Sequence, residues 1–130
     1  MGSLRTLVFG SIVLSGLAGP ALPLDLNSHP LLRQMSTCAG RFSALMEHQW
    51  LLDTNASDKT RQERAAFLDL IDALMPKDAG RTVLHWRVEA KLAHASLLTR
   101  ASFGRTATEI RRARTMSARY IAQCRTLLPG

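Results

Sequence analysis

The chain has 130 residues, of which 17 are lysine or arginine and 10 are aspartate or glutamate, so its formal net charge at pH 7 is +7. This length suits a single domain, one just large enough to bury a core. The basic balance favours anionic partners. The chain has only 4 Phe, 2 Trp and 1 Tyr for base stacking. This small number of aromatic residues, together with the secretory signal peptide expected over residues 1–21, argues against nucleic acid as the partner.

Residues 1–21 are typical of a secretory signal peptide. Arg5 stands in a short basic start, residues 7–18 form an apolar run, and small and helix-breaking residues follow up to Ala21. The run is shorter than the roughly 20 residues that span a membrane, so we expect cleavage after Ala21 rather than a permanent anchor. The processed protein is then periplasmic or secreted and not an integral membrane protein. Residues 22–130 are expected to form a single helical domain.

A first amphipathic helix is predicted over residues 31–52. Asn27 or Ser28 can cap its free amides, and Pro30 suits its first turn. Apolar side chains recur at alternating spacings of four and three, which predicts one buried seam. The seam consists of Leu31, Met35, Cys38, Phe42, Leu45 and Leu52.

Residues 53–59 are polar and turn-rich, and they are predicted to form a surface connection. A second helix is expected over residues 60–75, and Pro76 ends it. Its apolar face consists of Phe67, Leu70, Ile71 and Leu74.

The third predicted helix has two apolar strips, which indicates a wide buried face. The first strip contains Val83, Trp86, Ala90, Ala93 and Leu97, and the second contains Leu84, Val88 and Leu98. Gly104 is expected to close this helix in the left-handed conformation.

The fourth helix is predicted to open with a capping box from Thr106 to Glu109 and to run to about Leu128. Its seam consists of Ile110, Ala113, Ser117, Tyr120, Cys124 and Leu127.

These four helices with short connections predict an all-α, up-down-up-down four-helix bundle. In this topology Cys38 and Cys124 lie at comparable heights on facing seams, and Trp86 falls at the same end. Two cysteines in an exported protein favour a disulfide between them. A metal site or a redox pair fits less well, because the sequence has no CxxC pair and no Cys/His cluster at ligand spacing.

No motif in the chain indicates catalysis or a cofactor. Among the histidines, only His85 has a carboxylate, that of Glu89, at a spacing that could place two metal ligands on one turn of a predicted helix, and such pairs occur on any helix surface. The methionines are scattered within apolar stripes, where they usually fill gaps in a core. No serine lies in a GxSxG-like context. We therefore expect no enzyme activity, no metal site and no cofactor.

The strongest functional signal is the charge of the fourth helix. At 100° per residue its arginines project away from the buried seam, and Glu109 is the only carboxylate on this helix. The expected partner is an anionic envelope surface or an acidic protein; the alternative is an ordinary solvated helix face. The arginines are Arg105, Arg111, Arg112, Arg114, Arg119 and Arg125.

The segments Thr37–Ala44, Glu47–Trp50 and Trp86–Lys91 resemble small exported helical proteins of alphaproteobacteria. The resemblance implies a bacterial periplasmic setting and paired cysteines, and it carries no assigned function. Two functional hypotheses follow. The first is a non-catalytic periplasmic or secreted interaction module with a basic surface. The second is a carrier that holds a small ligand or metal in the interior of the bundle.

Overall fold

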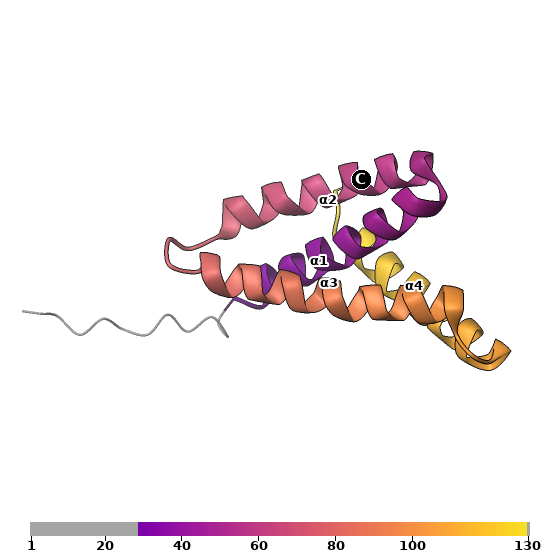
Figure 1. Ribbon diagram of the computed structural model, residues 1–130. Helices are drawn as coiled ribbons and strands as arrows, with labels where there is room; N and C mark the ends of the chain where they lie inside the picture. Colours follow the sequence, from indigo (N-terminus) through magenta and orange to yellow (C-terminus); the bar gives the residue numbers. More distant parts are fainter. Residues whose placement is uncertain (1–28, 130) are drawn as a thin grey trace, which may run out of the picture.

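The computed structural model describes residues 29–129, and within them it contains four α-helices and no strand (Figure 1). The helices are α1 (Pro30–Leu52), α2 (Thr54–Leu74), α3 (Gly80–Phe103) and α4 (Ala107–Arg125). The all-helical fold is thus confirmed. The expected signal peptide over residues 1–21 and the expected caps Asn27 and Ser28 lie outside the described residues. None of the described helices is both long and apolar enough to cross a membrane.

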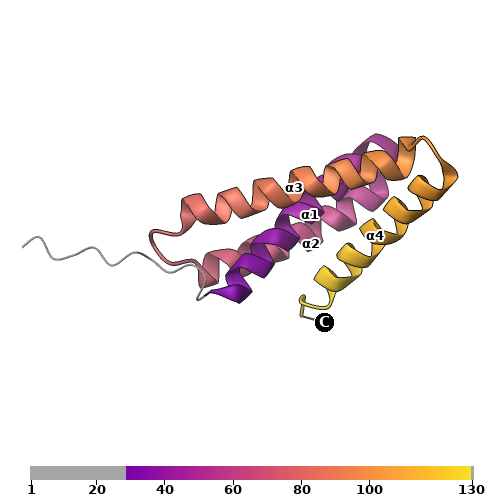
Figure 2. The ribbon, with the colours of Figure 1, turned by 90° about the horizontal axis from the view of Figure 1, so that it is seen from below.

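Helix α1 is the central element of the bundle. It packs mainly against α2 and α3, while α4 packs mainly against α3 and also contacts α1. Helices α1 and α3 run in the same direction, because Arg33 lies beside Trp86 near their starts and His48 bonds Ser102 near their ends. Helices α2 and α4 run the opposite way (Figure 2), as the predicted up-down-up-down topology requires.

The core lies around the middle of α1. Met35, Cys38 and Phe42 are buried, as the predicted seam requires. The Phe42 and Phe67 rings lie with their centroids 5.4 Å apart, which joins α1 to α2. The seam prediction was wrong at its two ends, where Leu31 and Leu52 are exposed. Since α1 has neighbours on several sides, its buried arc widens to include Leu32, Ser36, Ala39, Gly40 and Ser43.

Helix α2 begins six residues earlier than predicted. Asp53 is the only residue between α1 and α2, and its carboxylate accepts a hydrogen bond from the Ala56 amide at 3.2 Å. Ser57 and Thr60 are buried against α1, where the Ser57 hydroxyl donates to the Met46 carbonyl and the Thr60 hydroxyl to the Gln49 amide oxygen. The polar stretch is therefore helical because Asp53 caps it and α1 satisfies its hydroxyls.

The predicted wide buried face of α3 is only partly present. Val83, Leu97 and Leu98 are buried, but Leu84 and Val88 of the second strip are exposed. The neighbours of α3 are α1 and α4, and α2 lies on the other side of α1 rather than over this strip. An apolar strip without a covering helix stays in contact with solvent.

The turn between α3 and α4 differs from the prediction at Gly104. This residue has φ −58°, so it does not adopt the left-handed conformation. A Cβ atom at this position would lie 2.6 Å from the Arg100 carbonyl oxygen and 2.9 Å from Ile110. Close approach, rather than conformation, requires glycine here. Helix α4 then begins as predicted, with the Thr106 hydroxyl accepting from the Glu109 amide at 3.1 Å, but it ends at Arg125 rather than near Leu128.

Candidate functional site

The structure places all six predicted arginines at the surface, with Arg105 just before α4 and the other five along it. The side of α4 that faces the bundle consists of Ala113, Ser117, Ile121 and Cys124, which are buried. Arg114 borders this side and lines a cleft together with Ser117 and Ile121. Among residues 29–129 the ion pairs are Arg61–Asp58, Lys91–Glu47 and Arg125–Glu63. Five of the six predicted arginines therefore carry charges with no partner in the described part of the chain. We call these five the α4 basic face: Arg105, Arg111, Arg112, Arg114 and Arg119.

Arg125 has a different role from the other five. Its guanidinium donates two hydrogen bonds to the Glu63 carboxylate of α2, at 2.7 and 3.0 Å, and lies 5.8 Å from the Phe42 ring centroid. The bond to Glu63 raises the pKa of Arg125. Arg125 thus ties the end of α4 to α2, and for this reason it is not included in the α4 basic face. The pairing was not predicted because no local pattern marks Glu63, on another helix and 62 residues away in the sequence, as the partner of Arg125.

The structure adds Arg100 of α3 to the surroundings of this face. The short turn after Phe103 brings the last turn of α3 beside the first turns of α4, and a cleft of about 360 Å³ lies between them. Arg100 and Arg112 line this cleft together with Leu97 and Met116. The sequence held one signal for this, namely an arginine in the last turn before a short helix connection.

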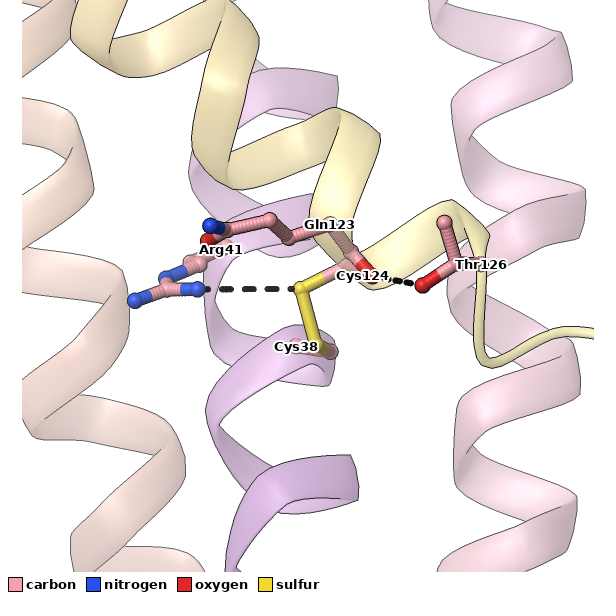
Figure 3. The surroundings of a disulfide bond; sticks show 5 residues. All are labelled: Cys38, Arg41, Gln123, Cys124 and Thr126. Atoms are coloured by element: carbon pink, nitrogen blue, oxygen red, sulfur yellow. Dashed lines mark hydrogen bonds between the residues drawn. A yellow bond between two sulfur atoms is a disulfide. The ribbon is translucent and has the colours of Figure 1, made fainter.

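The predicted disulfide between Cys38 and Cys124 is confirmed (Figure 3). It joins α1 to the last turn of α4 with a Cα–Cα distance of 5.5 Å, and both cysteines are buried. Trp86 packs against the core cluster that contains both cysteines. The burial of the bond makes it a structural link between helices rather than a group exposed for thiol exchange.

A cleft of about 680 Å³ lies beside the disulfide, between α1 and the end of α4. Arg41 crosses it: a guanidinium nitrogen lies 3.8 Å from the Cys124 sulfur, and the guanidinium carbon lies 4.4 Å from the Tyr120 ring centroid. Burial lowers the pKa of Arg41. Arg33 and Gln123 also line the cleft, which gives it a cationic, hydrogen-bonding character.

A buried histidine lies between α3 and α4. His94 Nε2 lies 3.2 Å from the Ser117 hydroxyl, and only 2% of His94 is exposed. Burial lowers the pKa of His94 to about 4, and the positive charge of Arg41 acts in the same direction. His94 is therefore neutral at pH 7 and serves as a packed, hydrogen-bonded core residue.

The pKa of His94 predicts that the protein loses stability in mild acid. The unfolded histidine has a pKa near 6.5, so between pH 6.5 and about 4 the unfolded chain binds a proton that the folded chain does not. The free energy of unfolding should be highest above pH 6.5 and fall by about 3 kcal/mol on this account as the pH decreases to 4. Urea unfolding between pH 7 and 4.5 measures this slope.

The control for this prediction is a pair of histidine variants on α3. His94→Gln should flatten the pH dependence of the urea midpoint, whereas His85→Gln removes an exposed histidine from the same helix and controls for the loss of an imidazole as such. An equal pH dependence in the native protein and in His94→Gln would contradict the assignment.

No group of three or more His, Cys, Asp or Glu side chains in residues 29–129 is placed to hold a metal ion. The histidine–carboxylate pair with ligand spacing, His85 and Glu89, lies on the exposed surface of α3. A search of protein-family models, curated proteins and solved structures finds no match to this chain. The functional argument consequently rests on the geometry of this chain.

Proposed function

We propose that this protein is a non-catalytic periplasmic or secreted interaction module that uses the α4 basic face to bind an anionic envelope surface or an acidic protein. The observation that carries the proposal is the exposure of five arginines on and beside one helix, without a carboxylate paired to any of their guanidinium groups in residues 29–129. Glu109, the only acidic residue of α4, accepts a hydrogen bond from the Arg105 backbone amide at 3.0 Å. It therefore serves the helix start.

Arginine suits this role because its planar guanidinium donates two parallel hydrogen bonds to a phosphate or a carboxylate. The rigid attachment of α4 supports the proposal as well. The disulfide fixes the end of α4 to α1, and Arg125 fixes it to α2. The arginines are thus presented from a held helix, which reduces the ordering cost of binding. The disulfide is also compatible with an oxidising compartment, in keeping with the proposed periplasmic or secreted location.

The test compares the native protein with a variant in which Arg111, Arg112, Arg114 and Arg119 are changed to glutamine. The binding partners are phosphatidylglycerol vesicles and immobilised polyglutamate, each at low and physiological salt. We expect the native protein to bind at least one of them, and the variant to bind at least roughly tenfold more weakly, since each basic residue near an anionic membrane surface contributes about 1 kcal/mol. Binding should weaken with added salt.

A matched control removes four basic charges elsewhere. Lys59, Arg61, Lys77 and Arg81 are exposed and lie on α2, on the turn after it and at the start of α3. Changing them to glutamine lowers the net charge by the same amount, but we expect most of the binding to remain. Equal losses of binding affinity in the two variants would mean that binding depends on net charge alone and not on the α4 basic face. No binding by the native protein at low salt would contradict the proposal.

The cleft beside the disulfide favours a second candidate function, the transport of a small anionic ligand. Its volume of about 680 Å³ and its lining by Arg33 and Arg41 suit a small molecule with a phosphate or carboxylate group. Native mass spectrometry of protein purified from its own compartment tests this candidate. A co-purifying small molecule that is lost in Arg41→Gln would support it, whereas the bare polypeptide mass would argue against it.

A further inference from the structure

Four large apolar side chains project from one end of the bundle. Trp50, Leu51 and Leu52 are the last three residues of α1, and they are 68%, 78% and 70% exposed; Phe103 is the last residue of α3 and is 78% exposed. Isolated exposed apolar residues are common on proteins, but four of this size at one end indicate a contact surface. We call these four residues the apolar tip.

The two parts of the apolar tip lie at the same end of the molecule. Helices α1 and α3 run in the same direction, and His48 Nε2 lies 3.2 Å from the Ser102 hydroxyl. Trp50 is two residues beyond His48, and Phe103 directly follows Ser102. Figures 1 and 2 both show the α1–α2 turn and the α3–α4 turn at the end of the molecule opposite the start of α1.

Two basic residues lie near Phe103 in the sequence. Arg100 and Arg105 flank Phe103 in sequence, and all three are exposed. Two carboxylates also lie near this end and keep their negative charge: Asp53 accepts a hydrogen bond from the Ala56 amide, and Glu109 accepts one from the Arg105 amide. Neither is ion-paired with Arg100 or Arg105. The end of the bundle therefore combines exposed aromatic and aliphatic groups with unpaired guanidinium groups.

We propose that the apolar tip inserts into the interfacial region of a bilayer containing anionic phospholipid, while the adjacent arginines contact the phosphates. This inference rests on the proposed function and selects a lipid surface over an acidic protein. Tryptophan favours the membrane interface, and arginine beside it binds anionic headgroups. Four partly inserted side chains suit reversible peripheral attachment rather than permanent anchoring.

Charge favours a lipid surface over a second copy of the chain as the occupant. A dimer formed tip to tip would bring Arg100 and Arg105 of both copies into one interface, and the whole chain already carries a net charge of +7. Like charges at an interface oppose association. An anionic bilayer instead provides phosphates for the arginines and an apolar layer for the side chains of the apolar tip.

The test uses the fluorescence of Trp50 in a Trp86→Phe background, where Trp50 is the only tryptophan. The variant is produced as the processed chain from residue 22 to Gly130, which contains all four helices. Circular dichroism first establishes that it is folded. On mixing with phosphatidylglycerol/phosphatidylcholine vesicles we expect a blue shift of Trp50 emission and quenching by brominated acyl chains. Pure phosphatidylcholine vesicles should produce neither effect.

Two triple variants separate the tip from general surface hydrophobicity. Changing Leu51, Leu52 and Phe103 to serine should weaken binding to the anionic vesicles by at least roughly tenfold, because the inserted apolar area is lost. Changing Leu84, Val88 and Leu92 to serine removes three other exposed apolar side chains, on α3 away from the tip, and should leave the vesicle affinity within about twofold of the native value.

The outcomes distinguish this inference from the proposed function. Salt-sensitive vesicle binding that requires the α4 arginines, with Trp50 emission unchanged, would overturn tip insertion and leave the basic-face proposal standing. Binding to neither vesicles nor polyglutamate would overturn both. Equal Trp50 shifts with neutral and anionic vesicles would also overturn the inference. Self-association that the Leu51/Leu52/Phe103 variant abolishes, without vesicle binding, would assign the tip to a second copy instead.

Discussion

Replacing Cys38 and Cys124 by serine is expected to lower the free energy of unfolding by about 4 to 5 kcal/mol. The bond closes a loop between residues 86 positions apart, and it restricts the unfolded chain more strongly than a short loop would. This loss is comparable to the whole stability of a small domain. Urea unfolding of the native protein and of the double variant, monitored by circular dichroism, measures the difference.

The geometry of α4 makes this dependence on the disulfide especially strong. Helix α4 packs mainly on α3, and its end is held to α1 by the disulfide and to α2 by the Arg125–Glu63 pair. Arg125→Gln in the oxidised protein is the control for the ion pair, and exposed pairs typically contribute less than about 1 kcal/mol. Two titratable thiols in the denatured native protein, or a loss under 1 kcal/mol in the double serine variant, would contradict the prediction.

The sequence was a sound guide wherever the structure depends on local periodicity. The four-and-three spacing of Met35, Cys38 and Phe42 identifies the buried side of α1, and the same spacing identifies Cys124 on α4. Short connections then limit the topology, which brings the two cysteines together. Helix existence and direction follow from information within one helix or one turn, and the disulfide follows from the topology together with the presence of two cysteines in the chain.

The features that were missed depend on which neighbour covers each helix face. Leu84 and Val88 follow the same apolar period as buried residues, yet no helix covers them. Ser57 lies in the predicted surface connection and Thr60 at the predicted start of the second helix. Both are buried, because carbonyl and amide groups of α1 accept their hydroxyl protons. A single sequence contains no record of these distant partners.

In the candidate site, too, some features follow from local periodicity and others depend on a distant neighbour. The exposure of the arginines on α4 follows from their angle to the seam, but the ion pair of Arg125 depends on Glu63 of another helix. Leu52 fitted the period of the α1 seam, and it is exposed because the chain reverses through Asp53 directly after it. The apolar tip could be recognised only after the two helix ends were placed side by side.

Gly40→Ala is expected to destabilise the protein by about 3 kcal/mol, at the upper end of the usual cost of overpacking. Gly40 lies on α1 where it crosses α3, and a Cβ atom here would overlap the Arg87 carbonyl oxygen and lie 3.0 Å from both the Ala90 Cβ and the Lys91 amide. Two of these groups belong to the α3 backbone, so no side-chain rotation relieves the overlap. The two helices must separate along the contact between α1 and α3.

Gly80→Ala is the matched control for this substitution. Gly80 begins α3, and a Cβ atom there meets nothing within 4 Å. Because alanine favours helix and restricts the unfolded chain, we expect this variant to be unchanged or more stable by up to about 1 kcal/mol. Helix propensity also favours alanine at Gly40. A net loss of stability in Gly40→Ala therefore measures how closely the backbones of α1 and α3 approach each other. Equal urea midpoints for the two variants would contradict the close crossing of α1 and α3.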